Sequence, residues 1–405
     1  MKSLQSSRFE TLVLPLLFSA LFLALGAVSA VTYEFPYTAL DEHAHVSFAA
    51  YLTTHFALLP DFDAIKIIDF NMHIPTNVPD YINHTPIGYF VLNALDGLFG
   101  LSATNSADKF VRFSSLVLFS SGYLVTVLTL FRQVALPLIM RVGLALLPFL
   151  LQLPLFAGFF SNDSLAFLGG SLAVAGAMIL LNTDHEDAGA GLAITLVGLL
   201  LAVAAKLTAA LLVGLFVACT LVFFALQRRG FWRACLKPLP LILLVLIAVA
   251  SIPYLLFIVK YGSPAPNTPG QILLLQGGDP NRIMPLLQYL WESLLGAISN
   301  AGGGLGMVSA YALFFVSVVL ATLFHIYQLV TGRGRAGSIP SIALAAGIAT
   351  ALMMLIQLTF SYHRHVTYGW QVELYPRYYF PLMGAYLLGL AGFINAVLPN
   401  RKPAP

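Results

Sequence analysis

Long uninterrupted apolar runs constrain this chain more than any other feature of its sequence. Ten such runs of roughly 20 residues occur, each long enough to cross a hydrocarbon core about 30 Å thick. Only 9% of the side chains are charged, whereas a water-soluble domain carries about a quarter, so most of the surface must face lipid. We therefore predict an all-α polytopic membrane protein that forms a single domain over residues 1–405. The expected spans are residues 11–32, 112–131, 135–158, 163–182, 188–204, 206–227, 237–259, 302–329, 339–360 and 377–397.

Two further apolar features need interpretation. The first run has a basic start and ends in Val28-Ser29-Ala30, which imitates a signal-peptidase site, but it is longer than the apolar part of a usual signal peptide. We therefore read it as a transmembrane helix. The stretch 86–100 is only about 15 residues long, which is short for a spanning helix. We expect it to lie in the outer interface or to be half inserted.

The distribution of basic residues predicts the orientation. With ten spans, the basic loops 228–233 and 333–335 and the basic tail fall on the same side as Lys2 and Arg8, which is the cytoplasmic side by the positive-inside rule. Both termini are then inside, and a loop of about 80 residues, 33–110, lies outside. The net charge of +3 gives no basic face for nucleic acid, and two cysteines support neither a disulfide framework nor a cysteine metal site.

The outer loop begins with an acid pair at the start of an expected helix. Asp41 and Glu42 precede an apolar stripe formed by Phe48, Leu52, Phe56 and Leu59, which predicts an amphipathic helix on the membrane or on neighbouring helices. Acids are common at helix starts because exposed N–H groups and the helix dipole stabilise them, so a capping role is one interpretation. The two carboxylates point about 100° apart, whereas Asp41 and His45 share a face, so one acid is expected to act and the other to support it.

The order of short motifs along most of the chain resembles the GT-C superfamily of polytopic membrane glycosyltransferases. These motifs are the outer Asp41-Glu42 pair, Pro86 followed by Tyr89, Arg112 at the mouth of the second span, Asn162-Asp163, Ala205-Lys206-Leu207-Thr208 and Pro376-Arg377-Tyr378-Tyr379-Phe380-Pro381. The related families are the protein O-mannosyltransferases, the lipid A aminoarabinose transferases and a bacterial branch. The aminoarabinose transferases have Glu-Lys-Pro where this chain has His84-Thr85-Pro86, which argues against aminoarabinose as the sugar.

The resemblance implies an enzyme of the bacterial inner membrane that acts at its outer, periplasmic face. It would move a sugar, with inversion, from a polyprenyl phosphate to a hydroxyl of a lipid, glycan or protein. Such a reaction needs a carboxylate to accept the hydroxyl proton, cations for the departing phosphate, and a groove for the lipid tail. The expected catalytic residues are Asp41, Glu42 and Asp163, and the expected substrate-binding residues are His45, His84, Lys109, Arg112, Lys206 and Arg377.

Each candidate also has a structural interpretation. Asp163 follows Ser161-Asn162 before an apolar run, as a helix cap does. Arg112, Lys206 and Arg377 stand at outer helix ends, where basic residues also anchor spans by reaching lipid headgroups. Histidines 43, 45, 84, 363 and 365 occur in outer segments, where they could form a divalent-metal site only if the fold brings these segments together. Their spacing matches no zinc motif, so we expect ordinary hydrogen bonds and no cofactor.

Two other functions compete with glycosyl transfer. A secondary transporter usually places ionisable residues at the bilayer midplane and breaks matched helices in two repeated halves, and this sequence has neither feature. An O-antigen ligase or polymerase normally has its long outer loop late in the chain, whereas here the longest loop comes first. A non-catalytic membrane scaffold is the remaining alternative.

Overall fold

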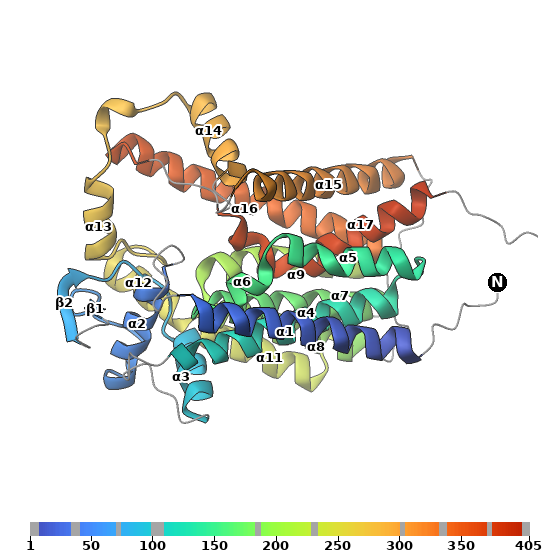
Figure 1. The fold of residues 1–405 in the computed structure, drawn as a ribbon, viewed down its shortest axis with the longest axis horizontal. Helices are drawn as coiled ribbons and strands as arrows, with labels where there is room; N and C mark the ends of the chain where they lie inside the picture. The colour runs from blue at the N-terminus through green and yellow to red at the C-terminus, as the bar shows by residue number, and fades with distance from the viewer. Residues whose placement is uncertain are drawn as a thin grey trace, which may run out of the picture.

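The protein is a bundle of long helices with a smaller assembly of short elements at one end (Figure 1). This description comes from a computed structural model. It covers residues 8–33, 41–69, 74–98, 109–182, 188–227, 234–299, 304–331, 338–370 and 375–398.

Within these residues, eight helices are long and apolar enough to cross a membrane. They confirm eight of the predicted spans, and the first run is one of them. They are η1 and α1 (Phe9–Val13 and Leu14–Thr32), α4 (Arg112–Gln133), α7 (Asp163–Asn182), α8 (Ala188–Ala205), α9 (Leu207–Gln227), α11 with α12 (Pro238–Ala250 and Ile252–Tyr261), α16 (Ser338–Tyr368), and η5 with α17 (Pro376–Leu382 and Met383–Val397).

The two other predicted spans are also helical, but one of them is broken. The run at 302–329 corresponds to α15 (Gly304–Val330). The run at 135–158 divides into α5 (Leu138–Leu150) and α6 (Leu153–Ala157), because Pro148 removes a backbone donor and Gln152 adopts a left-handed conformation with φ 55°.

Small residues bring α7 and α8 into close contact. A β-carbon on Gly176 would collide with the backbone of Thr195, and one on Gly198 would collide with the backbone of Ala173. Such close approach is how helices pack in membranes, where contact between apolar side chains gains little over contact with lipid. This rigid pair carries Asp163 at the start of α7 and leads through the end of α8 to Lys206.

The described parts of the loop 33–110, which is predicted to lie outside, form a compact unit at the end of the bundle where α1 finishes (Figure 1), and we call it the outer unit. It contains α2 (Glu42–Thr54), a two-stranded antiparallel sheet of β1 (Lys66–Asp69) and β2 (Ile74–Pro79), and α3 (Ile87–Leu98). The short helix predicted at 86–100 is therefore present, and Figure 1 shows it running across the direction of the long helices. The same end of the bundle carries α13 (Pro269–Gln276).

The amphipathic stripe predicted for the first outer helix is wrong in its second half. Helix α2 ends at Thr54, because Thr53 and Thr54 turn their hydroxyls onto backbone carbonyls and His55 leaves the helical conformation. Phe56 therefore lies outside the helix and is 82% exposed. The rest of α2 is buried on nearly every side, so the helix is part of the folded outer unit and does not lie freely on a membrane.

Candidate active site

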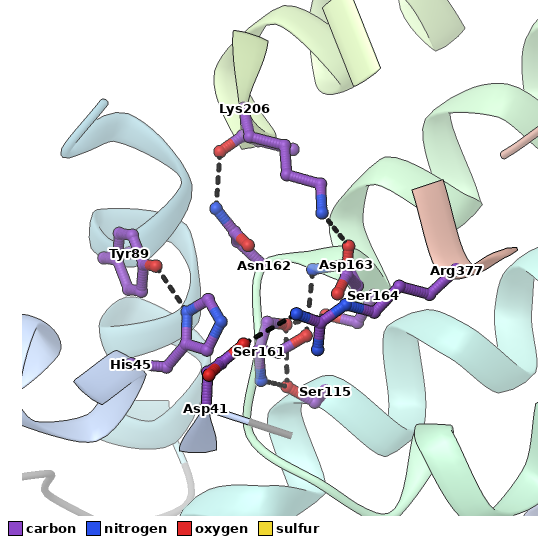
Figure 2. A network of polar contacts seen from close by, with 11 residues as sticks. Asp41, His45, Tyr89, Ser115, Ser161, Asn162, Asp163, Ser164, Lys206 and Arg377 are labelled. Atoms are coloured by element: carbon purple, nitrogen blue, oxygen red, sulfur yellow. Dashed lines mark hydrogen bonds and ion pairs between the residues drawn. The ribbon is translucent and has the colours of Figure 1, made fainter. Parts of the chain in front are cut away.

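Asp41 immediately precedes α2 and directs its carboxylate away from the helix. Its backbone is left-handed, with φ 61°, and its side chain makes no capping hydrogen bond. One oxygen, Oδ2, accepts from Nη2 of Arg377 at 2.6 Å, and the other, Oδ1, accepts from the Tyr81 hydroxyl at 2.8 Å. The segment that follows α1 and the beginning of the last span therefore meet at this carboxylate (Figure 2). Asp41 does not serve as a simple helix cap.

The surroundings of Asp41 favour its ionised form. Burial alone would raise the pKa of the carboxyl, but the charge and hydrogen bond of Arg377 and the hydrogen bond of Tyr81 outweigh burial, so the pKa lies below its ordinary value. The side chain keeps 35% of its surface exposed, whereas Arg377 keeps 14%. The result is a charged carboxylate that remains within reach of a ligand.

A second ion pair lies beside the first. Lys206 stands between α8 and α9 and donates from Nζ to Oδ1 of Asp163 at the start of α7. Ser161 caps the start of this helix, because its hydroxyl oxygen accepts from the Asp163 backbone N–H at 3.0 Å. Asn162 fixes the turn against α8 through a 2.8 Å bond to the Ala205 carbonyl. The Asp163 carboxylate is therefore not used as a cap and faces Lys206 (Figure 2). Its side chain is 15% exposed.

An aromatic ring joins the two pairs. Nζ of Lys206 lies 4.8 Å from the centre of the Tyr378 ring, and Cζ of Arg377 lies 5.7 Å from the same centre. Cations are attracted to ring faces at such distances. Arg377 and Asp163 also line one small cavity whose other walls are largely phenylalanines. Two carboxylates and two cations thus converge, although they come from four separate parts of the chain.

Glu42 and Arg112 form a different kind of pair. Both side chains are completely buried, and the guanidinium binds the carboxylate with two bonds, from Nε at 2.8 Å and from Nη2 at 2.6 Å. The Arg112 Nη1 group donates to the carbonyls of Ala30 and Tyr33, and Glu42 also accepts from the backbone N–H of Phe160. We predicted that Arg112 would bind a phosphate and that Glu42 would act on a substrate. In the structure the two side chains bind each other and have no exposed surface, which differs from both predictions.

Of the two predicted histidines, His45 lies beside Asp41 and His84 lies beside His45, and both are neutral. Nδ1 of His45 is 2.6 Å from the Tyr89 hydroxyl, and the rings of His45 and His84 stack with centres 5.8 Å apart. Burial lowers the pKa of His45 to about 4 and the pKa of His84 well below its ordinary value. At neutral pH neither imidazole supplies a positive charge, so the cations of this region are Arg377 and Lys206.

The remaining predictions concern Lys109 and metal binding. Lys109 begins a short turn (η3, Lys109–Val111) before α4, and its side chain lies outside the described residues. In the part of the chain that the structure covers, no three His, Cys, Asp or Glu side chains gather in a group able to hold a metal ion. His365 lies elsewhere, under the start of α14 (Leu286–Ser299), where its Nε2 accepts from the backbone N–H of Met284.

Two tyrosines of the site carry no motif that would reveal their roles in the sequence. Tyr81 follows β2 by two positions, and its position is fixed by long-range contacts of its neighbour Asp80. Tyr378 belongs to the segment that resembles the GT-C pattern, but its place between two cations depends on the packing of η5 against α7 and α9. Neither role has a local sequence signal.

An apolar cavity of about 360 Å³ lies close to the ion pairs. Its walls come from α14, α15, α16 and the beginning of the last span. Pro376, which lines the cavity, is the residue directly before Arg377. The lining is Leu294, Phe314, Phe315, Val318, Val319, Thr322, Leu323, Gly347, Thr350, Ala351, Met354, Pro376, Tyr379 and Tyr386.

Comparison with known proteins gives structural matches only. No family model matches the sequence, and no curated protein matches it. The structure is similar to ArnT from Cupriavidus metallidurans in the apo state, with a TM-score of 0.52 and 20% identity over 93% of this chain. ArnT bound to undecaprenyl phosphate matches with a TM-score of 0.52 and 18% identity over 93% of this chain.

A third solved structure is the oligosaccharyltransferase of Archaeoglobus fulgidus in complex with zinc and sulfate, with a TM-score of 0.48 and 16% identity over 95% of this chain and 49% of that one. The chain spans 59% of the length of the ArnT structures. The likeness to ArnT concerns the fold and confirms the architecture expected from the motifs. The protein therefore has the fold of the ArnT structures over 93% of its own length.

Proposed function

We propose that this protein is a glycosyltransferase that moves a sugar, with inversion, from a polyprenyl phosphate to a hydroxyl group of a lipid, glycan or protein. The observation that carries the proposal is the convergence of the Asp41–Arg377 and Asp163–Lys206 pairs at one end of the bundle. The reaction needs a base and cations at one place, and these pairs supply both.

In this proposal Asp41 is the base. Its carboxylate is ionised and partly exposed, as acceptance of a proton from the attacking hydroxyl requires. As the acceptor oxygen bonds to the sugar, the bond from the sugar to the phosphate breaks, and the phosphate leaves with the electron pair. Asp163 is the second acid. It holds Lys206, one of the two cations that would face the phosphate of the sugar donor.

Arg377 and Lys206 would stabilise the departing phosphate. A guanidinium grips phosphate oxygens with two parallel bonds, and an ammonium adds a compact charge. Both cations are already held by carboxylates, so no charge is left unpaired while the site is empty. The buried Glu42–Arg112 pair would act through Asp41, since it fixes the first residue of α2 against α1 and α4.

The lipid tail of the donor would occupy the apolar cavity between α15, α16 and the last span. Its lining of leucine, valine, phenylalanine and methionine side chains suits an isoprenoid, which offers only hydrocarbon. The cavity reaches Pro376, so a chain lying in it presents its phosphate beside Arg377. A polyprenyl donor would therefore approach the ion pairs from within the membrane.

We place the site on the outer face of the bacterial inner membrane, with both termini inside. In Figure 1 helix α1 begins and α17 ends at the end of the bundle opposite the outer unit, as an even number of crossings requires. The basic loops on which the orientation was predicted, 228–233 and 333–335, lie outside the described residues. Their sequence still supports this orientation.

The test is transfer of sugar from a defined polyprenyl-phosphate sugar by the purified protein. Asp41→Asn should lower the rate by about 100- to 10,000-fold and leave the protein folded, because it removes the base and keeps the size of the side chain. Asp61→Asn is the matched control, since Asp61 is an exposed acid of the same outer loop. Full activity of Asp41→Asn would refute the role of Asp41, and an inactive wild-type protein would refute the function.

A further inference from the structure

We propose that Tyr81, supported by His43, is a positioning residue for the proposed base: it holds one oxygen of the Asp41 carboxylate for the acceptor, while Arg377 holds the other for the donor. The inference rests on the proposed function, in which Asp41 accepts the proton. It assigns the two oxygens of one carboxylate to two different sides of the reaction.

The geometry separates the two oxygens. Oδ2 faces Arg377, which shares a cavity with Asp163 and a tyrosine ring with Lys206, so this oxygen looks toward the cations of the donor side. Oδ1 faces Tyr81, which belongs to the outer unit and has no part in that cavity. The acceptor substrate must approach Asp41 from the side that the cations do not fill. Tyr81 lies on that side and donates a hydrogen bond to Asp41.

His43 orients the Tyr81 hydroxyl toward Asp41. Its Nε2 lies 3.4 Å from the hydroxyl oxygen, and the two rings pack edge to face with centres 5.7 Å apart. An Nε2–H group that donates to the tyrosine oxygen makes the tyrosine hydrogen point at Asp41. Successive donors in such a chain polarise one another, so the bond to the carboxylate is stronger than that of an isolated tyrosine.

The backbone holds Tyr81 in place from both sides. Asp80 donates its N–H to the Ile65 carbonyl at 3.0 Å, and its own carbonyl accepts from the Thr268 hydroxyl at 3.0 Å. The side-chain carboxyl group of Asp80 accepts from the Ile82 N–H through Oδ1 at 2.9 Å. These bonds fix the backbone on either side of Tyr81, so little backbone freedom is lost when its hydroxyl meets Asp41.

The inference predicts a specific change in proton affinity. Arg377 faces Asp41 from η5, and His43 and His45 face it from α2. The other titratable groups that face Asp41 are Asp80 and Tyr81 from the segment after β2 and Tyr89 from α3. Tyr81 donates to the ionised carboxylate and so favours that form, and its loss must raise the pKa of Asp41. Arg377 remains in place, so binding of the donor should hardly change.

The first measurement needs no catalysis. Carbodiimide labels protonated carboxyl groups, and mass spectrometry of the full-length protein in detergent gives the pH at which half of Asp41 is labelled. Tyr81→Phe should move this midpoint upward by about 1 to 2 pH units, as loss of one hydrogen bond to a charged group implies. His43→Leu should move it in the same direction by less. Tyr51→Phe is the control, because Tyr51 is a half-buried tyrosine of α2 that stacks on His55.

The second measurement is the pH profile of sugar transfer. Tyr81→Phe should lower kcat about tenfold, shift the acid limb of kcat/KM to higher pH, and leave KM for the donor unchanged. A purely structural role of Tyr81 would lower activity without changing the proton affinity of Asp41. The inference is therefore overturned if kcat falls while the acid limb of the kcat/KM profile stays in place, or if the labelling midpoint does not move. If Tyr81→Phe does not fold, a midpoint unchanged in His43→Leu overturns it. Absence of transfer by the wild-type protein counts against the proposed function, and the labelling result then decides the role of Tyr81 by itself.

Discussion

Arg377 and Arg112 each face a carboxylate, but only Arg377 does so at the edge of a cavity. Arg377 keeps 14% of its side chain exposed, whereas Arg112 and its partner Glu42 have none. A ligand can compete for a partly exposed ion pair, while a fully buried pair can only be broken by unfolding its surroundings. The same residue type therefore serves binding in one place and stability in the other.

This difference predicts opposite outcomes for two identical substitutions. Arg377→Lys should leave the protein folded and lower transfer by about 10- to 100-fold, because an ammonium cannot grip a phosphate with a planar two-point fork. Arg112→Lys should destabilise the protein by roughly 2–4 kcal/mol, since it breaks a buried two-point pair and frees two carbonyls. Transfer rates and thermal unfolding of the two purified variants separate these effects. Near-normal transfer by Arg377→Lys would leave that arginine as a membrane anchor.

Asp80 presents a different situation, because it is a buried acid with no cation beside it among the described residues. It is 1% exposed, and burial raises its pKa to about 8, so the carboxyl group is neutral over the acid and neutral range. The folded-state pKa lies above the unfolded one. The stability linked to this group is therefore complete below about pH 4 and is lost as the pH rises through 8.

Asp80→Asn should remove this pH dependence. The amide oxygen can still accept from the Ile82 N–H, and asparagine never has to bear a buried charge. We expect the variant and the wild type to unfold at similar temperatures at pH 5, and the variant to be the more stable protein at pH 9. Thermal unfolding at both pH values measures the difference. A gap that does not grow between pH 5 and pH 9 would show that Asp80 is already ionised at neutral pH.

At the scale of elements, the α7–α8 pair fixes one half of the site. Asp163 and Lys206 lie at the ends of these two helices, so the distance between them depends on how closely the helices pack. The glycines at the contact allow the backbones to approach until no space remains for a β-carbon. A shift of one helix therefore moves the cation relative to its carboxylate.

Gly198→Ala should thus lower both stability and activity. The added methyl group meets the backbone of Ala173, and the resulting overpacking destabilises by about 1–3 kcal/mol. Gly143→Ala is the matched control, since a β-carbon at Gly143 in α5 has no atom within 4 Å and alanine favours a helix over glycine by about 0.5–1 kcal/mol. Thermal unfolding of the two variants should shift in opposite directions. Equal shifts would mean that α7 and α8 do not pack as described.

At the scale of the whole molecule, the bundle was predictable and the pairing within the site was not. An apolar run of about 20 residues is stable in lipid only as helix, and this preference depends on the run itself. The predicted runs are therefore helical in the described residues, although the run at 135–158 is divided into two helices. Which arginine meets which acid is decided by packing between distant segments. Glu42 stands next to Asp41 in the sequence, yet Glu42 pairs with Arg112 at the start of α4 and Asp41 pairs with Arg377 in η5. The broken helix at Gln152 and the early end of α2 likewise depend on tertiary contacts.

The orientation of the bundle decides on which side of the membrane the chemistry takes place. The ten predicted crossings would put the outer unit on the face opposite both termini, and the basic loops predict that the termini lie in the cytoplasm. In a background without Cys219 and Cys235, a single cysteine at Asp61 in the outer unit should react in intact cells with a thiol reagent that cannot cross the membrane. A cysteine at Arg335, between α15 and α16, should react only after the membrane is opened. The reverse pattern would place the two ion pairs in the cytoplasm, where the proposed transfer at the outer face could not occur.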